Sequence, residues 1–232
     1  MTPLAPPAVA VVMPVLNAAP FIAAAIASVL GQLPPESEML VVDGGSEDGS
    51  QAVAAGFSGV QVLMQSGRGM AAARNQGLAA ARADIIGFCD GDDRWSADAL
   101  VQRMEWLATH PDCDAVIGQV VLEALPGEPV TPQQGTRLGK RLPGFTPGAL
   151  LARRHVFEAI GPFDEALTIA ADSDWFVRLV QSDLGLAVLP VVVLHKGARA
   201  AALSSELATY RRELLRIGRR HVKHRQAIAG RG

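Results

Sequence analysis

The chain has 232 residues and a formal net charge of −2 at neutral pH. It is 49% hydrophobic and 19% charged, which excludes wholesale disorder and allows a sizeable core in one domain with a short appendage. The near-neutral charge gives no general attraction to nucleic acid, so we expect no nucleic-acid partner.

The N-terminal residues and the cysteines indicate a cytoplasmic protein. Residues 1–7 contain neither a basic nor an apolar segment, so no secretion signal is predicted. The alanine-rich run from Phe21 to Leu30 is too short to span a bilayer, which takes about 20 apolar residues. Cys89 and Cys113 lack metal-ligand spacing and are expected to be buried, reduced thiols, although two cysteines alone leave a disulfide open.

Apolar runs alternate with helical patterns through the first half of the chain. Strands are expected at residues 9–13, 39–42, 60–64 and 85–89. Asn17 is the expected cap of a helix that runs to about residue 32, and a second helix is expected over 70–81. Continuous apolar strands separated by helices are typical of a mostly parallel central sheet with helices on both faces, so the predicted fold class is α/β.

The second half of the chain is less regular. Its expected elements are a strand at 115–122, an irregular loop rich in Gly, Pro and Gln at 126–148, a helix at 172–181 and a strand at 186–194. From Ser205 the tail carries eight basic residues, and 206–225 can form a helix with a strongly basic surface. Such a helix suits peripheral contact with anionic lipid at the inner face of the membrane, or a homodimer interface. The alternative is a solvated terminal helix.

Acidic residues follow two of the predicted strands. Asp43 follows the second strand, and Asp90, Asp92 and Asp93 follow the fourth. Ligands bind outside the carboxyl ends of the strands in open parallel sheets, and a cation can compensate the repulsion between clustered carboxylates. Carboxylate oxygens suit Mg²⁺ or Mn²⁺, which also bind substrate phosphates. The alternative interpretation is an acidic turn in which Asp93 or Ser96 caps the next helix.

Four segments occur in order and are more specific together than any of them is alone. They are Val11-Val12-Met13-Pro14-Val15-Leu16-Asn17, Val41-Val42-Asp43-Gly44-Gly45-Ser46-Glu47-Asp48-Gly49-Ser50, Ala73-Arg74-Asn75-Gln76-Gly77 and Phe88-Cys89-Asp90-Gly91-Asp92-Asp93. This pattern resembles the family 2 glycosyltransferases, and the likeness continues at 147–151, 161–165, 172–176 and 194–196. The resemblance implies a GT-A-type nucleotide-diphospho-sugar transferase domain over 8–204, divided into a nucleotide-binding half (8–95) and an acceptor-side half (96–204). Residues 205–232 remain as a basic tail.

The resemblance also implies a reaction and a set of site residues. A hexose would move from a nucleotide diphosphate sugar, with a UDP-sugar as the expected donor, to an acceptor hydroxyl with inversion. The residues implied to bind the donor are Pro14, Val15, Asn17, Asp43, Arg74, Asp90, Gly91, His195 and Arg199. Asp92 with Asp90 is the implied site for Mn²⁺ or Mg²⁺, and Asp172 is the implied catalytic base.

The acceptor side is the least specified part of the expected site. Trp175, one turn from Asp172, is expected there because aromatic faces pack on sugar rings. Asp174 is assigned to the same side, pointing away from Asp172 and bracing the site through hydrogen bonds. Nothing in the sequence distinguishes a glycan, lipid, peptide or small-molecule acceptor.

Departures from the family pattern leave a second interpretation open. Gly44 stands where many members have a second Asp, and Ala171 stands where a Glu often precedes the base. The His, Gly and Asn that often follow the Leu-His-Lys segment are replaced by Arg199, Ala200 and Ala202. The alternative is therefore a catalytically degenerate module that binds a sugar nucleotide without transferring the sugar.

A third interpretation is an NAD-dependent Rossmann oxidoreductase. Residues 67–72 match G-x-G-x-x-A between a strand and a helix, with Asp90 about 20 residues further on. This fingerprint follows the third strand rather than the first, and it leaves Asp43 and Asp92 without a role. The transferase interpretation is therefore preferred.

Overall fold

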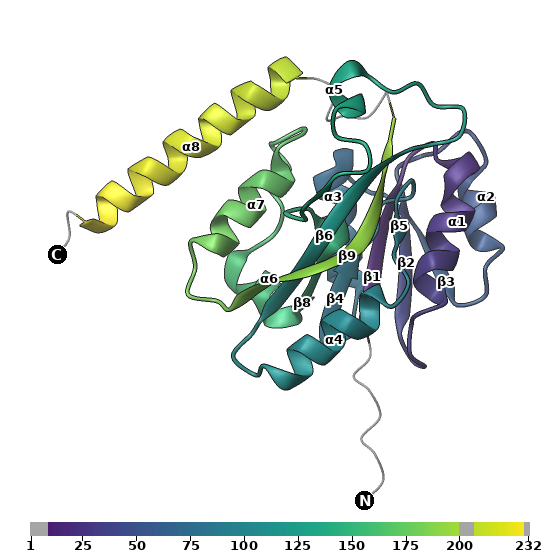
Figure 1. Cartoon of the computed structure of the whole chain (residues 1–232), viewed down its shortest axis with the longest axis horizontal. Helices are drawn as coiled ribbons and strands as arrows, with labels where there is room; N and C mark the ends of the chain where they lie inside the picture. Colours follow the sequence, from purple (N-terminus) through teal and green to yellow (C-terminus); the bar gives the residue numbers. More distant parts are fainter. Residues whose placement is uncertain (1–8, 200–206, 230–232) are drawn as a thin grey trace, which may run out of the picture.

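A twisted sheet with helices packed against it forms the body of the protein (Figure 1). The computed structural model describes residues 9–199 and 207–229. Its strands are β1 (Val9–Val15), β2 (Glu38–Asp43), β3 (Val60–Met64), β4 (Ile85–Phe88), β5 (Arg94–Trp95), β6 (Ala115–Ala124), β7 (Arg141–Pro143), β8 (Leu150–Arg153) and β9 (Leu186–Ala198). Its α-helices are α1 (Ala19–Leu30), α2 (Ser50–Ala55), α3 (Gly69–Ala80), α4 (Ala99–Thr109), α5 (Pro132–Gly135), α6 (Arg154–Ile160), α7 (Ala171–Val180) and α8 (Leu207–Ala229), and η1 (Pro147–Ala149) is a 3₁₀ helix.

The strands follow the order β3-β2-β1-β4-β8-β6-β9-β5, and β7 pairs with β6. β3, β2, β1 and β4 are parallel to one another, and so are β6 and β9. β8 is antiparallel to both β4 and β6, and β5 is antiparallel to β9. The predicted α/β fold with a mostly parallel central sheet is confirmed.

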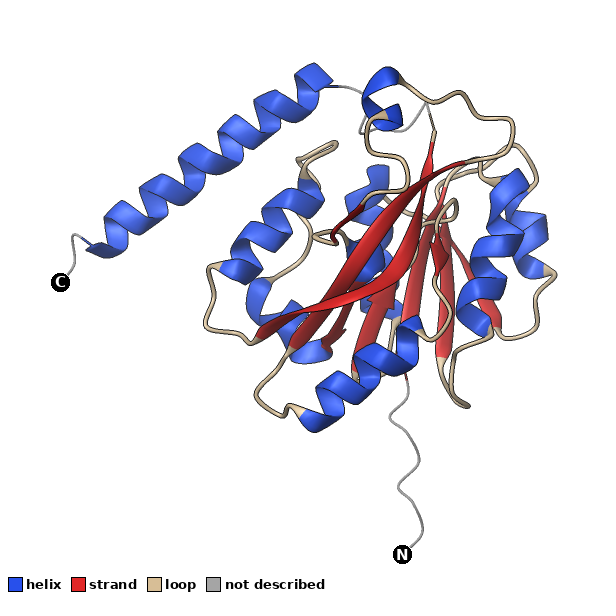
Figure 2. Ribbon diagram, viewed as in Figure 1, coloured by secondary structure: helices blue, strands red, loops and turns tan. Residues whose placement is uncertain are grey.

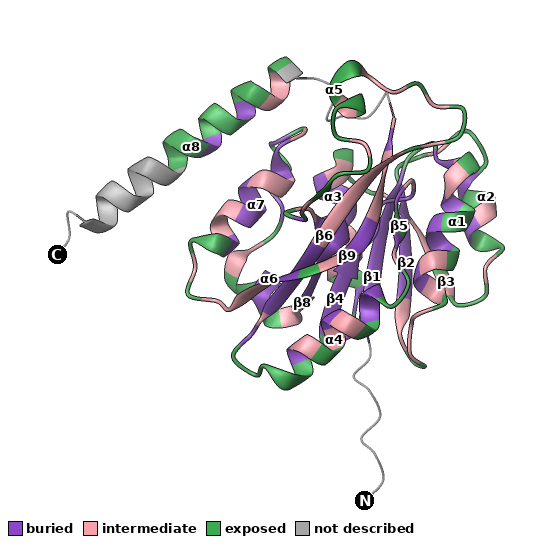
Figure 3. Ribbon diagram, in the orientation of Figure 1, coloured by how far each residue is buried: buried purple, intermediate pink, exposed green. Residues whose placement is uncertain are grey.

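Both faces of the central strands are buried (Figures 2 and 3). Side chains alternate between the two faces of a strand. Val11 and Met13 of β1 therefore lie in a cluster with residues of α1 and α4, whereas Ala10 and Val12 lie in a cluster with residues of α3, α6 and α7. This two-sided burial explains why β1 is a continuous apolar run rather than an alternating one.

Two helix starts differ from the sequence predictions. α1 begins at Ala19 with Ala18 as its cap, so Asn17 is not the cap residue. Asn17 has a φ of 50°, a left-handed conformation that Asn tolerates, and its Oδ1 accepts a hydrogen bond from Glu47 N at 2.9 Å. α4 begins after Asp98, so neither Asp93 nor Ser96 caps it, and the acidic-turn interpretation is wrong.

The segment 126–148 is more regular than predicted. α5 begins at a capping box, in which the Thr131 hydroxyl accepts from Gln134 N and the Gln134 side chain accepts from Thr131 N. β7 then pairs antiparallel with β6 through Leu142 and Val120. β5, β7 and β8, which are two to four residues long, have no counterpart in the sequence predictions.

The terminal helix α8 corresponds to the helix predicted over 206–225, and it lies beside α7 (Figure 1). Ile217 of α8 is 4% exposed and belongs to the same buried cluster as α7. None of the helices in the described residues has the length and apolar character needed to cross a membrane. Cys89 and Cys113 are both buried and free.

Candidate active site

The carboxyl ends of β1, β2 and β4 meet at one edge of the sheet. Gly91 N, after β4, donates to Pro14 O at 3.3 Å, and Asn17 N donates to Ser46 Oγ, in the turn after β2, at 2.9 Å. The parallel order of these strands thus brings together six of the predicted donor-binding residues, namely Pro14, Val15, Asn17, Asp43, Asp90 and Gly91.

Asp43 is a buried carboxylate, 1% exposed, with one unpaired oxygen. Its Oδ2 accepts hydrogen bonds from Gly45 N at 3.2 Å and Ser46 N at 3.0 Å. Its Oδ1 is buried and has no hydrogen-bond partner. A buried polar atom without a partner costs free energy, so this oxygen is suited to accept a hydrogen bond from a bound ligand.

Arg74 of α3 connects two carboxylates that are 82 positions apart in the sequence. Its guanidinium lies 2.5 Å from Asp172 Oδ1 through Nη1, and 2.9 Å from Asp90 Oδ1 through Nη2. Arg74 is 2% exposed. Burial by itself lowers the pKa of Arg74, but the charges of Asp172 and Asp90 raise it above its ordinary value, so the guanidinium stays charged.

The acidic loop after β4 holds its three carboxylates in different environments. Burial opposes ionisation of Asp90, but Arg74 and Lys196 keep the pKa of Asp90 below its usual range. Burial and the neighbouring charge of Asp90 raise the pKa of Asp92. Burial raises the pKa of Asp93 to about 7 even though Lys196 opposes the shift. Asp90 is therefore the carboxylate of this loop that ionises most readily.

Lys196 is the residue of this site that the sequence analysis missed. Its Nζ lies 3.3 Å from Asp93 Oδ2 and 3.8 Å from Asp90 Oδ2, and these charges raise its pKa. His195 was expected to bind the donor, but its side chain lies elsewhere: its Nδ1 forms a hydrogen bond with Glu123 Oε1 at 2.6 Å. Neighbouring residues of β9 face opposite sides, so Lys196 faces the acidic loop, whereas His195 lines a cavity of about 530 Å³ beside α1 together with Arg94.

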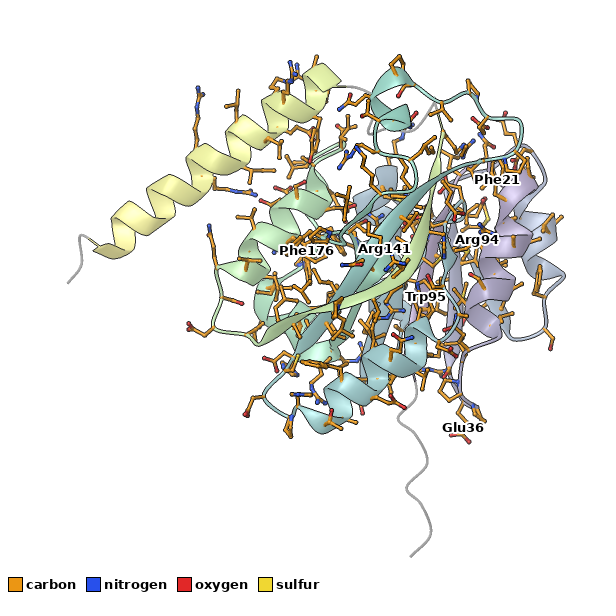
Figure 4. All side chains as sticks on the ribbon, viewed as in Figure 1. Phe21, Glu36, Arg94, Trp95, Arg141 and Phe176 are labelled. Atoms are coloured by element: carbon orange, nitrogen blue, oxygen red, sulfur yellow. The ribbon has the colours of Figure 1, made fainter. Side chains whose placement is uncertain are left out.

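Arg199 lies at the same edge of the sheet. Its Nη2 donates to Asn17 O at 3.1 Å, and its Nη1 lies 3.6 Å from Asp92 Oδ2. Its guanidinium also lies over the ring of Phe21, which Figure 4 labels at α1. The replaced residues Ala200 and Ala202 lie outside the described residues.

Asp172 lies in the first turn of α7, and Ala170 rather than Asp172 is the cap residue of that helix. Its side chain is 29% exposed and bonds Arg74 as described above. Burial and the charge of Asp90 raise the pKa of Asp172, whereas Arg74 opposes the shift. A half-buried carboxylate with a raised pKa is a stronger base than a free one.

The side chains of Trp175 and Asp174 have different surroundings from that of Asp172. Trp175 is fully buried, its ring centroid lies 5.1 Å from that of Phe157, and its Nε1 donates to Gly161 O at 3.0 Å. Asp174 is also fully buried and binds Arg178 and Arg220. Trp175 is therefore a core residue, and its expected acceptor-side placement is wrong. Asp174 lines a cavity of about 500 Å³ beside Arg178 and Arg220, and its acceptor-side assignment stays a prediction.

The site suits a divalent cation that also contacts a ligand. In the described part of the chain, four carboxylates (Asp90, Asp92, Asp93 and Asp172) lie among three cations (Arg74, Lys196 and Arg199). The described residues contain no group of three His, Cys, Asp or Glu side chains arranged to hold a metal. Mg²⁺ and Mn²⁺ are commonly bound by one or two carboxylates together with substrate phosphates, which fits a partly exposed Asp92.

The dinucleotide-binding alternative has the wrong topology. The glycine-rich residues 67–72 follow β3, which lies at the edge of the sheet, and α3 begins within them at Gly69. Asp90 binds Arg74 and so does not stand ready for a ribose hydroxyl. The fingerprint therefore matches in spacing but not in position.

Comparisons with known proteins agree with this geometry. The family model described as "Glycosyl transferase family 2" matches residues 10–162. The chain is 35% identical over 114 residues to "Uncharacterized glycosyltransferase EpsJ" of Bacillus subtilis (strain 168), and the match covers 47% of this chain and 33% of that relative.

Two solved structures share the fold. The mannosyltransferase PcManGT from Pyrobaculum calidifontis, in complex with GDP-Man and Mn²⁺, has a TM-score of 0.69 and 21% identity, and the match covers 94% of this chain and 64% of that one. TarS of S. aureus, in complex with UDP-GlcNAc, has a TM-score of 0.67 and 18% identity, with coverage of 86% and 61%. The chain thus spans about three fifths of these two structures and a third of EpsJ.

Proposed function

Because the chain belongs to the family 2 glycosyltransferases, we propose that it transfers a hexose from a nucleoside diphosphate sugar to an acceptor hydroxyl, with inversion. The observation that carries this proposal is the buried bridge through Arg74, which joins the carboxylate Asp172 to the acidic loop at Asp90. A base and a diphosphate-binding loop are the two parts that the reaction needs side by side.

The donor would lie along the carboxyl ends of β1, β2 and β4. The unpaired Oδ1 of Asp43 can accept a hydrogen bond from the nucleotide base or the ribose, next to the segment 14–17. Arg199 and Lys196 provide positive charge for the phosphates. Two structural relatives bind UDP-GlcNAc and GDP-Man, and a UDP-sugar is our expected donor.

Asp172 is the proposed catalytic base. As the acceptor oxygen attacks the anomeric carbon, its proton passes to the Asp172 carboxylate and the diphosphate leaves from the opposite face. The position of Asp172 in the first turn of α7 stabilises its ionised form, and Arg74 fixes its orientation. Mn²⁺ or Mg²⁺, when bound by Asp92 with Asp90 beside it, would stabilise charge on the departing diphosphate.

A binding module without transferase activity is the second candidate. The observation that favours it is the ion pair between Arg199 and Asp92, because it occupies the proposed metal ligand with a protein cation. Such a module would bind the same donors but would not release a diphosphate from them.

One experiment separates these candidates. Purified protein is incubated with UDP-GlcNAc or GDP-mannose and Mn²⁺, and the slow release of the nucleoside diphosphate in water is measured for wild type, Asp172→Asn and the exposed control Asp112→Asn. We expect Asp172→Asn to lose about 10²–10⁴-fold in turnover, the usual contribution of a general base, while donor affinity by calorimetry is unchanged. Binding without any release by wild type would support the module, and full turnover by Asp172→Asn would exclude it as the base.

We also propose a peripheral contact between α8 and an anionic membrane surface. The outward face of α8 carries four exposed arginines and an exposed leucine, namely Arg211, Arg212, Arg216, Arg219 and Leu215. Leu215 is 65% exposed, and an apolar side chain among arginines is typical of helices that lie in a lipid interface. A homodimer through the same face is the alternative.

A further inference from the structure

A buried carboxylate of α8 binds the segment that leads into α7. Glu213 is 8% exposed, and it accepts hydrogen bonds from three successive backbone N–H groups. Thr168 N donates to Oε1 at 2.9 Å, and Ile169 N and Ala170 N donate to Oε2 at 3.0 and 2.8 Å. Burial alone raises the pKa of Glu213, but these N–H donors lower it below its usual value, so the carboxylate is charged where it binds.

α8 also binds the two residues that follow Asp172. Tyr210 Oη and Ser173 Oγ share a hydrogen bond of 3.1 Å. Arg220 binds Asp174, and its Nη1 donates to Asp164 Oδ2 at 3.0 Å. The chain on both sides of Asp172 is therefore attached to α8, before it through the backbone of 168–170 and after it through the side chains of Ser173 and Asp174. The Asp172 side chain itself binds Arg74 of α3.

We propose that Glu213 is a positioning residue for Asp172: by fixing residues 168–170, it sets where α7 begins and hence where the base carboxylate lies. This inference rests on the proposed function, in which Asp172 is the base. It also makes α8 part of the catalytic domain rather than the separate tail that the sequence suggested.

Glu213 can position this segment because the three N–H groups precede α7 and have no hydrogen-bond partner within it. Glu213 supplies the acceptor for these three groups from another helix, whereas the side chain of Ala170, the cap of α7, offers no hydrogen bond. Without Glu213, the segment 168–170 can shift, and the Asp172 carboxylate shifts with it. A misplacement of about 1 Å in a reacting group can cost about 10²-fold in rate.

The test compares Glu213→Ala and Glu213→Gln with Glu158→Gln, an exposed glutamate of α6, in the full chain. Glu213→Gln keeps the shape of the side chain but presents an N–H group to one of the backbone donors, so it should impair turnover without unfolding the protein. Diphosphate release from UDP-GlcNAc and GDP-mannose gives kcat, and calorimetry gives the donor Kd. We expect kcat to fall about 10–100-fold in both Glu213 variants, with the donor Kd unchanged and Glu158→Gln equal to wild type.

A double variant distinguishes positioning from a general loss of structure. If Glu213 acts through Asp172, the pair Asp172→Asn/Glu213→Ala should be no slower than Asp172→Asn alone, because residues that act as a unit are not additive. Additive losses, or a wild-type kcat in a folded Glu213→Gln, would overturn the inference and leave the base assignment intact. Full activity of Asp172→Asn would instead overturn the proposed function, so the two failures are distinguishable.

Discussion

The bridge through Arg74 gives the sharpest prediction for stability. Arg74→Met keeps an unbranched side chain of similar length in a site that is 2% exposed, but it removes the charge between Asp90 and Asp172. Two carboxylates then face each other in a buried site without the guanidinium that both of them bind. The variant therefore tests whether the site is held by that charge.

The expected loss follows from the burial of the bridge. Removing one partner of a buried ion pair costs about 3–5 kcal/mol, because an uncompensated charge remains in the interior. For a chain of this size, that loss corresponds to roughly 6–20 °C in Tm. The matched control is Arg82→Met, whose side chain is 86% exposed and pairs with Glu38. Such a surface pair contributes about 0–1 kcal/mol.

The assay is urea unfolding of wild type and both variants at several pH values. In wild type, the pKa of Asp90 is held low, so its share of the stability is present above the unfolded pKa, about 3.9, and is lost as pH falls through the folded value. In Arg74→Met, both carboxylates become easier to protonate, so the gap from wild type should be largest near pH 7 and should narrow towards pH 4. A loss no greater than that of Arg82→Met, or a gap independent of pH, would refute this account.

Three further predictions concern the metal, the core and α8. Asp92→Asn should abolish the Mn²⁺-dependent part of donor binding without lowering Tm, and calorimetry with and without EDTA checks it; an unchanged metal effect contradicts the assignment. Gly77→Ala should destabilise by about 1–3 kcal/mol despite its better helix propensity, because the new Cβ would clash with the Val12 side chain; unchanged urea unfolding would count against it. Arg212→Glu/Arg219→Glu should reduce co-sedimentation with anionic vesicles at low salt. If wild type and variant sediment equally, or if neither sediments with the vesicles, the proposed membrane contact is wrong.

The first half of the fold is readable from the sequence because β1, β2 and β4 contain continuous apolar runs. β1 and β2 are buried on both faces, and acidic or glycine-rich turns follow β2 and β4. Since parallel strands end at the same edge of the sheet, Asp43 and Asp90 had to lie at that one edge. That inference needed no knowledge of side-chain contacts.

The choice between His195 and Lys196 needed information that the sequence lacks. Which of two neighbouring strand residues faces the site depends on register, and a slip of one residue exchanges them. The pairing of β6 with β9 contains register shifts around Gln119, which no local pattern announces. The role of Glu213 was equally hidden, because its partners lie 43 to 45 residues earlier in the chain.

The pairing of β5 with β9 has a consequence for how the site forms during synthesis. The acidic loop lies between β4 and β5, and Arg94 of β5 is opposite His195 of β9. Gly197 N also donates to Asp93 Oδ1 across 104 residues. Contacts so distant in sequence form slowly, and they cannot form before β9 has left the ribosome. A nascent chain can therefore assemble β1 to β4 early, but its acidic loop gains these β9 partners only once nearly the whole domain has been made.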